Sequence, residues 1–257
     1  MRLKIAAGNW KMNNTFSEGT KLIRKINTSI HSTPPKQSEK ELKVVLGVPF
    51  ILLKTAGRLT QEMPRIEIAA QNCYSEEKGA YTGEISAEMV KSTGAAYVII
   101  GHSERRDYFN ESHEMLAKKV NLAIKHDLKP IFCCGEKLVI RQKNEHFDLI
   151  KKQIQESLFQ VSKEDFKKVV IAYEPVWAIG TGVTASPEQA QEMHLFIRNL
   201  LKEKYGEKIA NDTSILYGGS VNAKNASELF SQPDVDGGLV GGASLKAEDF
   251  VTIVKSF

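Results

Sequence analysis

The sequence has too few cysteines for a fold held by disulfides or by structural zinc. Its 257 residues include three cysteines, of which Cys133 and Cys134 are adjacent, so a bond between them would be strained. There is no Cys-X-X-Cys pair and no Cys/His spacing typical of a zinc site. This sparse use of cysteine favours a reducing compartment.

Long apolar runs and a strong excess of charge are also missing. Lys4 interrupts the apolar run of segment 1–11, which therefore lacks the core of a signal peptide, and no segment approaches the ~20 apolar residues of a membrane span. The formal net charge of +4 helps to attract small anions but is too weak to indicate nucleic-acid binding. We therefore expect a cytoplasmic protein without membrane or nucleic-acid partners.

Short apolar runs separated by amphipathic stretches are the main pattern that is present. The runs are continuous rather than alternating, as expected for parallel strands covered on both faces. The eight runs are Leu3–Ala7, Val44–Val48, Ile66–Ala70, Ala96–Ile100, Pro130–Cys134, Val169–Tyr173, Ser214–Tyr217 and Gly238–Val240.

Between these runs, several segments carry apolar residues at helical spacing. The clearest are Phe16–Ile30, Glu114–Ile124 and Pro187–Leu201. The last is preceded by Ser186 as its N-cap and has Pro187 at its first helical position.

Strands that alternate with helices predict a parallel α/β fold, and a (β/α)8 barrel of typically ~250 residues fits this length. A doubly wound sheet would need a glycine-rich dinucleotide turn after the first strand, and Gly8–Lys11 (GNWK) is not one. We expect a single domain over residues 1–257.

In a parallel barrel the catalytic groups lie at the C-terminal ends of the strands. The first strand delivers Asn9 and Lys11, and a lysine here suits a phosphate or an enolate, although it can also simply be solvent-exposed. The fourth strand delivers His102 next to a helical turn that starts near Glu104, with Ser103 as the expected cap. The partial positive charge of a helix N-terminus favours a neutral imidazole that can donate a hydrogen bond. A purely structural histidine is the alternative.

The later strands deliver an acid and two glycine-rich turns. Glu174 stands directly before Pro175, which ends its strand, and it is placed to act as a base unless it pairs with a neighbouring helix. The seventh and eighth strands are followed by Tyr217–Ser220 and Gly241–Ser244, whose glycines let backbone N–H groups approach an anion. These two loops often form the phosphate site of such barrels, although tight turns alone also need glycine.

Taken together, these segments resemble the triosephosphate isomerase family over essentially the whole chain. The resemblance rests on Gly8–Asn13 (GNWKMN), Gly101–Arg106 (GHSERR), Ala172–Gly182 (AYEPVWAIGTG), Tyr217–Asn222 (YGGSVN) and Gly238–Leu245 (GLVGGASL). It implies a TIM barrel enzyme that interconverts dihydroxyacetone phosphate and D-glyceraldehyde 3-phosphate through an enediolate, in glycolysis and gluconeogenesis. It also implies that no metal or organic cofactor takes part.

The resemblance assigns a role to each residue at the strand ends. Glu174 matches the base that removes a proton from the carbon next to the carbonyl. His102 matches the neutral electrophile on the carbonyl oxygen, and Asn9 and Lys11 match the groups that polarise the substrate and compensate its charge. Glu104 matches an acid near that lysine.

The resemblance further implies a lid over Pro175–Thr184, with Gly182 as a hinge, and a grip on the substrate phosphate. The groups of that grip are the N–H of Gly180, Ser220, Gly241 and Gly242.

A homodimer is implied by segment Gln71–Ser86, which contains Gly79–Glu84 (GAYTGE) and resembles the family's interdigitating loop. The threonine of that loop, here Thr82, reaches the partner's site near its lysine. Cys73 would lie near this interface and is therefore a candidate for thiol sensitivity.

One departure and two alternatives remain. The polar segment Ser32–Glu41 is longer than the family's usual turn, but no shift in composition follows it and we expect it opposite the active site.

The chain can also be another barrel enzyme on a small phosphorylated substrate, such as a phosphoribosyl isomerase or an aldolase with a Schiff base at Lys11. A binding protein that retains the barrel is the second alternative, against which the intact Asn9, His102 and Glu174 argue.

Overall fold

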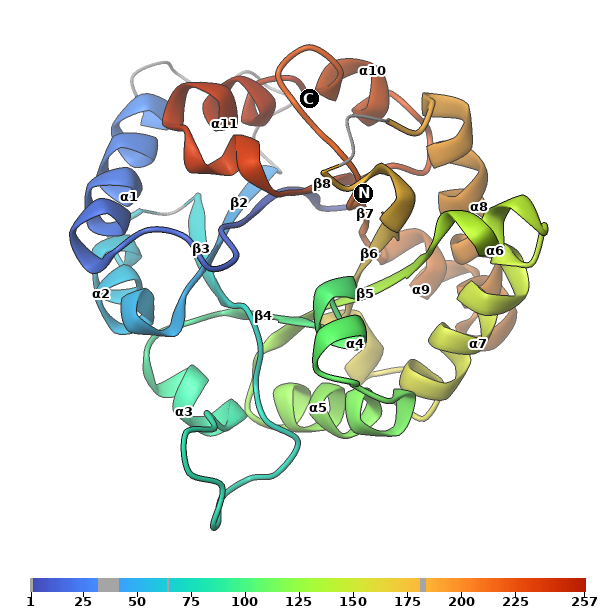
Figure 1. The fold of residues 1–257 in the computed structure, drawn as a ribbon, viewed down its shortest axis with the longest axis horizontal. Coiled ribbons are helices and arrows are strands. Elements are labelled where there is room, and N and C mark those ends of the chain that lie inside the picture. The colour runs from blue at the N-terminus through green and yellow to red at the C-terminus, as the bar shows by residue number, and fades with distance from the viewer. Residues whose placement is uncertain (1, 32–41, 64, 181–183) are drawn as a thin grey trace.

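The computed structural model describes residues 2–31, 42–63, 65–180 and 184–257, and these form a closed barrel (Figure 1). Neighbouring strands pair in parallel in chain order, and the first strand also pairs with the eighth. The strands are β1 (Lys4–Asn9), β2 (Leu42–Val48), β3 (Ile66–Ala70), β4 (Tyr97–Ile100), β5 (Lys129–Glu136), β6 (Val170–Pro175), β7 (Ile215–Tyr217) and β8 (Gly237–Val240). The predicted (β/α)8 barrel is thus confirmed, and each expected strand is found to within two residues at either end.

Helices surround the barrel and alternate with its strands (Figure 1). They are α1 (Phe16–His31), α2 (Phe50–Thr60), α3 (Ala87–Ser92), α4 (Ser103–Tyr108), α5 (His113–Lys125), α6 (Leu138–Gln142), α7 (His146–Leu158), α8 (Pro187–Tyr205), α9 (Glu207–Asp212), α10 (Ala226–Phe230) and α11 (Ala247–Val254), with short 3₁₀ helices η2 (Asp165–Lys168), η3 (Val176–Ala178) and η4 (Gly242–Leu245). Nowhere in the described ranges is a helix both long and apolar enough to cross a membrane.

The start of α8 follows the sequence prediction closely. The hydroxyl of Ser186 accepts a hydrogen bond from the N–H of Gln189 at 3.2 Å, and the Gln189 side chain accepts one from the N–H of Ser186 at 2.9 Å. This reciprocal pair satisfies two N–H groups that the helix cannot pair itself. With Pro187 as the first helical residue, the predicted cap is confirmed.

Alternate residues of each strand separate into two apolar clusters. Ile5 and Ala7 of β1 belong to a cluster contributed by the strands, whereas Ala6 belongs to a larger cluster that also contains the buried faces of the helices. Successive side chains of a strand point to opposite faces, so the first cluster fills the barrel interior and the second lies beneath the helices. A filled barrel leaves its C-terminal rim, and not a central pore, as the place for a site.

Some sequence predictions lie outside the described residues. They concern the connection Ser32–Glu41, the hinge at Gly182 and the middle of the lid, residues 181–183.

Candidate active site

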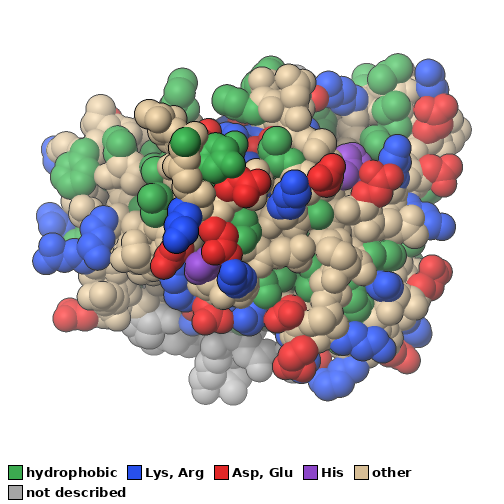
Figure 2. Space-filling view, turned by 90° about the horizontal axis from the view of Figure 1, so that it is seen from below, with side chains coloured by type: hydrophobic (Ala, Val, Ile, Leu, Met, Phe, Trp, Pro, Cys, Tyr) green, Lys and Arg blue, Asp and Glu red, His purple; other side chains and the backbone are tan. Residues whose placement is uncertain are grey.

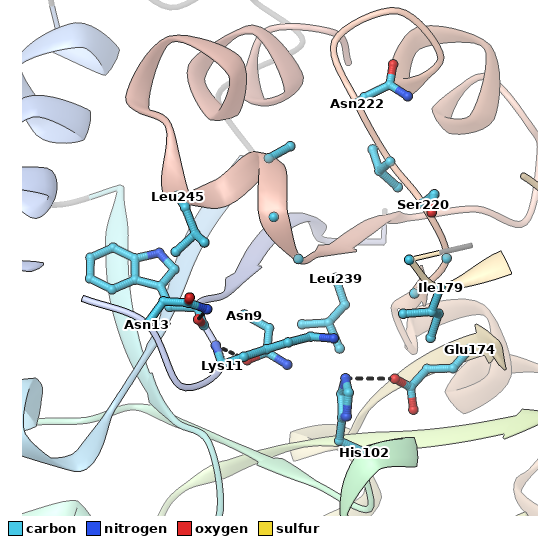
Figure 3. Close-up of a pocket in the computed structure, with 18 residues that line it drawn as sticks. Asn9, Lys11, Asn13, His102, Glu174, Ile179, Ser220, Asn222, Leu239 and Leu245 are labelled. Atoms are coloured by element: carbon cyan, nitrogen blue, oxygen red, sulfur yellow. Dashed lines mark hydrogen bonds and ion pairs between the residues drawn. The ribbon is translucent and has the colours of Figure 1, made fainter. Parts of the chain in front are cut away.

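A cavity of about 390 Å³ opens at the rim where the strands end, and it brings the predicted site residues together (Figure 3). The predicted residues that line it are Asn9, Lys11, His102, Glu174, Gly180, Ser220, Gly241 and Gly242. They come from five different βα connections, so closure of the barrel is what assembles them.

Glu174 is the buried acid of this cavity and is 1% exposed. Its Oε2 accepts a hydrogen bond from the N–H of Ser103 at 2.9 Å, its Oε1 accepts one from the Ser103 hydroxyl at 3.3 Å, and Nε2 of His102 lies 3.0 Å from Oε1. Burial raises the pKa of Glu174, and the adjacent His102, the Ser103 N–H and the charges of Arg106 and Lys11 oppose that rise. A carboxylate with a raised pKa is a stronger base.

His102 itself caps helix α4, so our prediction that Ser103 is the cap was wrong. Nδ1 of His102 accepts the N–H of Glu104 at 3.2 Å, and Ser103 is already the first helical residue. Nδ1 is bonded to Cγ, as is the side-chain oxygen of an asparagine cap, so it can reach the same N–H. The carboxylate of Glu104 is 3.6 Å from Nδ1, too far for a hydrogen bond.

The cap also fixes the chemical state of the ring. Since Nδ1 accepts a hydrogen bond, the proton of the neutral ring must be on Nε2. Figure 3 shows Nε2 facing the carboxylate of Glu174 at the floor of the cavity. His102 is therefore a neutral hydrogen-bond donor beside a buried base.

Lys11 adopts a left-handed backbone conformation that glycine usually provides. Its φ is 51°, a conformation that costs an ordinary residue about 1–2 kcal/mol. The side chain of Asn9 accepts the N–H of Lys11 at 3.0 Å, and the ammonium lies 2.6 Å from Oε1 of Glu104. The Lys11 side chain runs across the cavity above His102 (Figure 3). Asn9 and Glu104 thus hold the lysine at opposite ends.

The turn after β8 presents backbone to the cavity. Among the described residues, a Cβ built on Gly242 would meet no atom within 4 Å, and one built on Gly241 would meet only Cε of Lys11, at 3.8 Å. Gly242 begins η4, whose first N–H groups have no partner within the helix. The turn can therefore admit an anion beside the lysine.

The turn after β7 is joined to the first part of the segment that was predicted to form a lid. The hydroxyl of Ser220 donates a hydrogen bond to the carbonyl of Ala178 at 2.6 Å. Gly180 follows with φ 69°, which suits glycine. Both residues face the same cavity as the turn after β8.

The two residues predicted at a dimer interface lie away from this cavity. Thr82 is exposed on the loop of residues 71–86, which projects from the barrel next to α3 (Figure 1). Cys73 is fully buried, and burial raises the pKa of its thiol to about 12, so its reactive thiolate is scarce at neutral pH.

Sequence reasoning gave no individual role to several residues of the cavity wall. They are Trp10, Asn13, Ile179, Val221, Asn222, Leu239, Ala243 and Leu245. Most are apolar and carry no chemical signal, and only their positions within the recognised motifs could have indicated them. Gly218 and Gly219, which also line the cavity, belong to the turn that was predicted to approach an anion.

Metal ligands are not gathered in the described part of the chain. Within it, no group of three or more His, Cys, Asp and Glu side chains could hold an ion. The two acids at the site, Glu104 and Glu174, are instead engaged by Lys11 and Ser103.

The comparisons with known proteins agree along nearly the whole length. The family model described as Triosephosphate isomerase matches residues 4–257. Curated proteins named triosephosphate isomerase from Porphyromonas gingivalis and Bacteroides fragilis are 51% and 52% identical over 257 residues, covering 100% of both chains. One from Flavobacterium psychrophilum is 51% identical over 254 residues, covering 99% of each chain.

Proposed function

Because the chain belongs to the triosephosphate isomerase family and interconverts dihydroxyacetone phosphate and D-glyceraldehyde 3-phosphate, we propose that Glu174, His102, Lys11 and Asn9 carry out this reaction. The observation that carries the proposal is a buried carboxylate and a neutral imidazole donor in contact at 3.0 Å in a cavity that also holds a lysine. Family membership decides against the aldolase-like alternative and against a binding protein. The amine of Lys11 is also held by Glu104 at 2.6 Å and is not free to attack a carbonyl.

In the proposed mechanism, Glu174 takes a proton from the carbon next to the substrate carbonyl. The electron pair of the broken C–H bond forms a carbon–carbon double bond, and the carbonyl oxygen becomes negative. The Nε2–H of His102 and the ammonium of Lys11 stabilise that oxygen, with the Asn9 side chain as a further donor. A proton moves from the neighbouring hydroxyl to this negative oxygen, with His102 placed to carry it between the two oxygens. The electron pair left on the deprotonated oxygen then forms the new carbonyl, while the proton held by Glu174 returns to the carbon that carried the original carbonyl. Since only protons move, no metal or organic cofactor is needed.

Ser103 holds the base before substrate binds. Its N–H and hydroxyl both bond the carboxylate of Glu174. We propose that Glu174 exchanges these partners for the substrate carbon, because a carboxylate that keeps both hydrogen bonds is a weaker base.

The substrate phosphate is proposed to bind the N–H groups of Gly180, Gly241 and Gly242 and the hydroxyl of Ser220. The open space at Gly242 and the start of a 3₁₀ helix there support this assignment. Lys11, which passes beside Gly241, adds a positive charge.

Gly242→Val is expected to raise KM for triose phosphate by about tenfold or more, equivalent to about 1.4 kcal/mol. Its Cβ would meet no atom of the described ranges within 4 Å, so the new side chain should occupy ligand space without disturbing the fold. Steady-state kinetics and thermal unfolding check this, and Gly242→Ala should show a smaller rise. An unchanged KM in a stable Gly242→Val protein would remove this turn from the phosphate site.

A homodimer is the proposed assembly, with Thr82 reaching the site of the partner subunit near its lysine. Large apolar side chains are exposed on and near the projecting loop, with Met12, Tyr81, Met89, Tyr108 and Phe109 between 41% and 97% exposed. Figure 2, which looks at this side of the molecule, shows hydrophobic side chains mainly in its upper half. Apolar groups gathered in this way are typical of a protein interface.

Sedimentation equilibrium is expected to give twice the 28.7 kDa mass of one chain. Met89→Glu, at the base of the loop, should shift the protein toward monomers and lower its activity, because it places a charge in the proposed interface. Leu195→Glu is the matched control, since Leu195 is 44% exposed on α8, far from the loop, and this variant should stay dimeric. A fully active protein with the mass of a single chain would contradict the proposed dimer.

We also propose a cytoplasmic location, where the enzyme serves glycolysis and gluconeogenesis. All three cysteines are free and buried, which suits a reducing compartment. Fractionation of the source cells tests this, and activity confined to an extracellular fraction would contradict it.

A further inference from the structure

We propose that Gln71 is a positioning residue for Lys11. Its side-chain amide holds the main chain of Lys11 in the left-handed conformation that directs the ammonium into the cavity. The inference rests on the proposed role of Lys11 and extends it to a residue that does not touch the substrate.

The evidence is a pair of hydrogen bonds from one nitrogen. Nε2 of Gln71 donates to the carbonyl of Lys11 at 3.0 Å and to the carbonyl of Gly47 at 2.9 Å. On the other side of the residue, the Asn9 side chain accepts the N–H of Lys11. Both main-chain polar groups of Lys11 are therefore held by side chains, and the carbonyl of Gly47 ties Gln71 to the end of strand β2.

The conformation matters because it sets the direction of the side chain. An unrestrained lysine prefers negative φ, and a rotation from 51° to that region would turn Cβ away from its present direction. In the present conformation Cε lies beside the Gly241 turn and Nζ meets Glu104. The backbone of Lys11 must therefore be held for its charge to lie between the phosphate turn and His102.

The residue that follows Gln71 in the sequence is held by a buried ion pair. This residue, Asn72, accepts a hydrogen bond from Nζ of Lys119 at 2.8 Å. Lys119 pairs with Glu111 at 2.6 Å, and both side chains are only 2% exposed. Such a pair tolerates little movement, because separating the two buried charges is costly.

The same ion pair also contacts the residue that follows Glu104. Oε1 of Glu111 also accepts a hydrogen bond from Nε of Arg105 at 2.6 Å. Arg105 directly follows Glu104, the acid that holds the ammonium of Lys11. One buried cluster thus contacts the sequence neighbours of both residues that hold Lys11: Gln71, which binds its backbone, and Glu104, which binds its ammonium.

The test begins with Gln71→Met, which keeps the length of the side chain but removes both donors. Only a fraction of the molecules would then hold Lys11 in place, and the apparent KM rises as that fraction falls. A competent fraction of about one tenth would raise KM about tenfold, while kcat stays within about threefold. The matched control is Gln153→Met. Gln153 also makes two hydrogen bonds to backbone groups, with the N–H and C=O of Gly135 at 2.9 Å each, but has no contact with Lys11. Both variants should lose thermal stability, and only Gln71→Met should raise KM.

Gln71→Glu provides a readout that a merely structural role would not give. A neutral glutamic acid keeps one donor, whereas a carboxylate would place its oxygens against two carbonyl oxygens. KM should therefore increase between about pH 5 and pH 8 in this variant as the acid ionises, and the same dependence should be missing in wild type and Gln71→Met. Oligomeric state is measured in parallel, so that dissociation is not mistaken for misplacement of the lysine.

Lys11→Met separates this inference from the proposed function. If it raises KM and Gln71→Met does not, the positioning role is wrong and the role of Lys11 stands. If Lys11→Met leaves both KM and kcat unchanged, the proposed role of Lys11 fails, and the inference fails with it. The inference further requires that Gln71→Met added to Lys11→Met raises KM no further.

Discussion

Glu174→Gln is expected to lower kcat by about 10²–10⁴-fold or more, since it removes the proposed general base. Glutamine has nearly the shape of glutamate and can still accept the N–H of Ser103, so the local structure should persist. Its amide oxygen cannot hold the substrate proton, and the double bond of the enediolate cannot form without a base. A coupled assay starting from D-glyceraldehyde 3-phosphate measures the loss. Glu174→Ala should lose a similar factor.

The matched control for that variant is Glu192→Gln. Its side chain is 54% exposed on α8 and contacts Arg141 rather than the cavity, so the same chemical change should leave the rate within about twofold of wild type. Retention of more than about a tenth of the wild-type kcat by folded Glu174→Gln would remove Glu174 from the role of base.

His102→Asn is expected to lower kcat by about 10²–10³-fold, because it removes one donor to the developing oxyanion. Asparagine is a good N-cap, and its side-chain oxygen can take the place of Nδ1 in accepting the N–H of Glu104. Helix α4 should therefore remain capped while the Nε2–H disappears from the cavity. This choice separates the catalytic effect from the structural one.

His102→Leu is the companion variant, since it removes the donor and the cap together. It should lose a similar factor in kcat and in addition be less stable than His102→Asn by about 1 kcal/mol. Kinetics and urea unfolding of the two proteins check this. A His102→Asn protein with nearly full activity would show that the carbonyl oxygen is stabilised by other groups.

Much of the fold could be predicted because parallel strands carry a simple signal. Each strand is buried on both faces and so reads as a short continuous apolar run, as β3 does at Ile66–Ala70. The amphipathic segment and the cap of α8 are local patterns as well. Several strands extend past their predicted ends into polar residues, as at Asn9, Glu136 and Glu174, and two of these, Asn9 and Glu174, line the cavity.

The residue types of the site could also be predicted, but the contacts among them could not. Ser103 and Glu174 are 71 positions apart, and their hydrogen bonds exist only because the barrel closes. Our error over the cap of α4 arose because serine is the common cap, whereas the histidine before it has an acceptor that reaches the same N–H. The left-handed backbone of Lys11 gave no signal, since no glycine marks it, and neither did the amide of Gln71 that supports it.

The most direct test of the account follows solvent hydrogen into the product. Dihydroxyacetone phosphate is incubated in D₂O with the wild-type protein and with Glu174→Gln, and the product is examined by NMR. If Glu174 transfers the proton, the proton that it holds can exchange with solvent. Wild type should therefore form glyceraldehyde 3-phosphate with deuterium on the carbon that carried the carbonyl. Glu174→Gln should lose both this exchange and the isomerisation. Product that retains the original hydrogen throughout, or exchange at the wild-type rate in Glu174→Gln, would contradict the account.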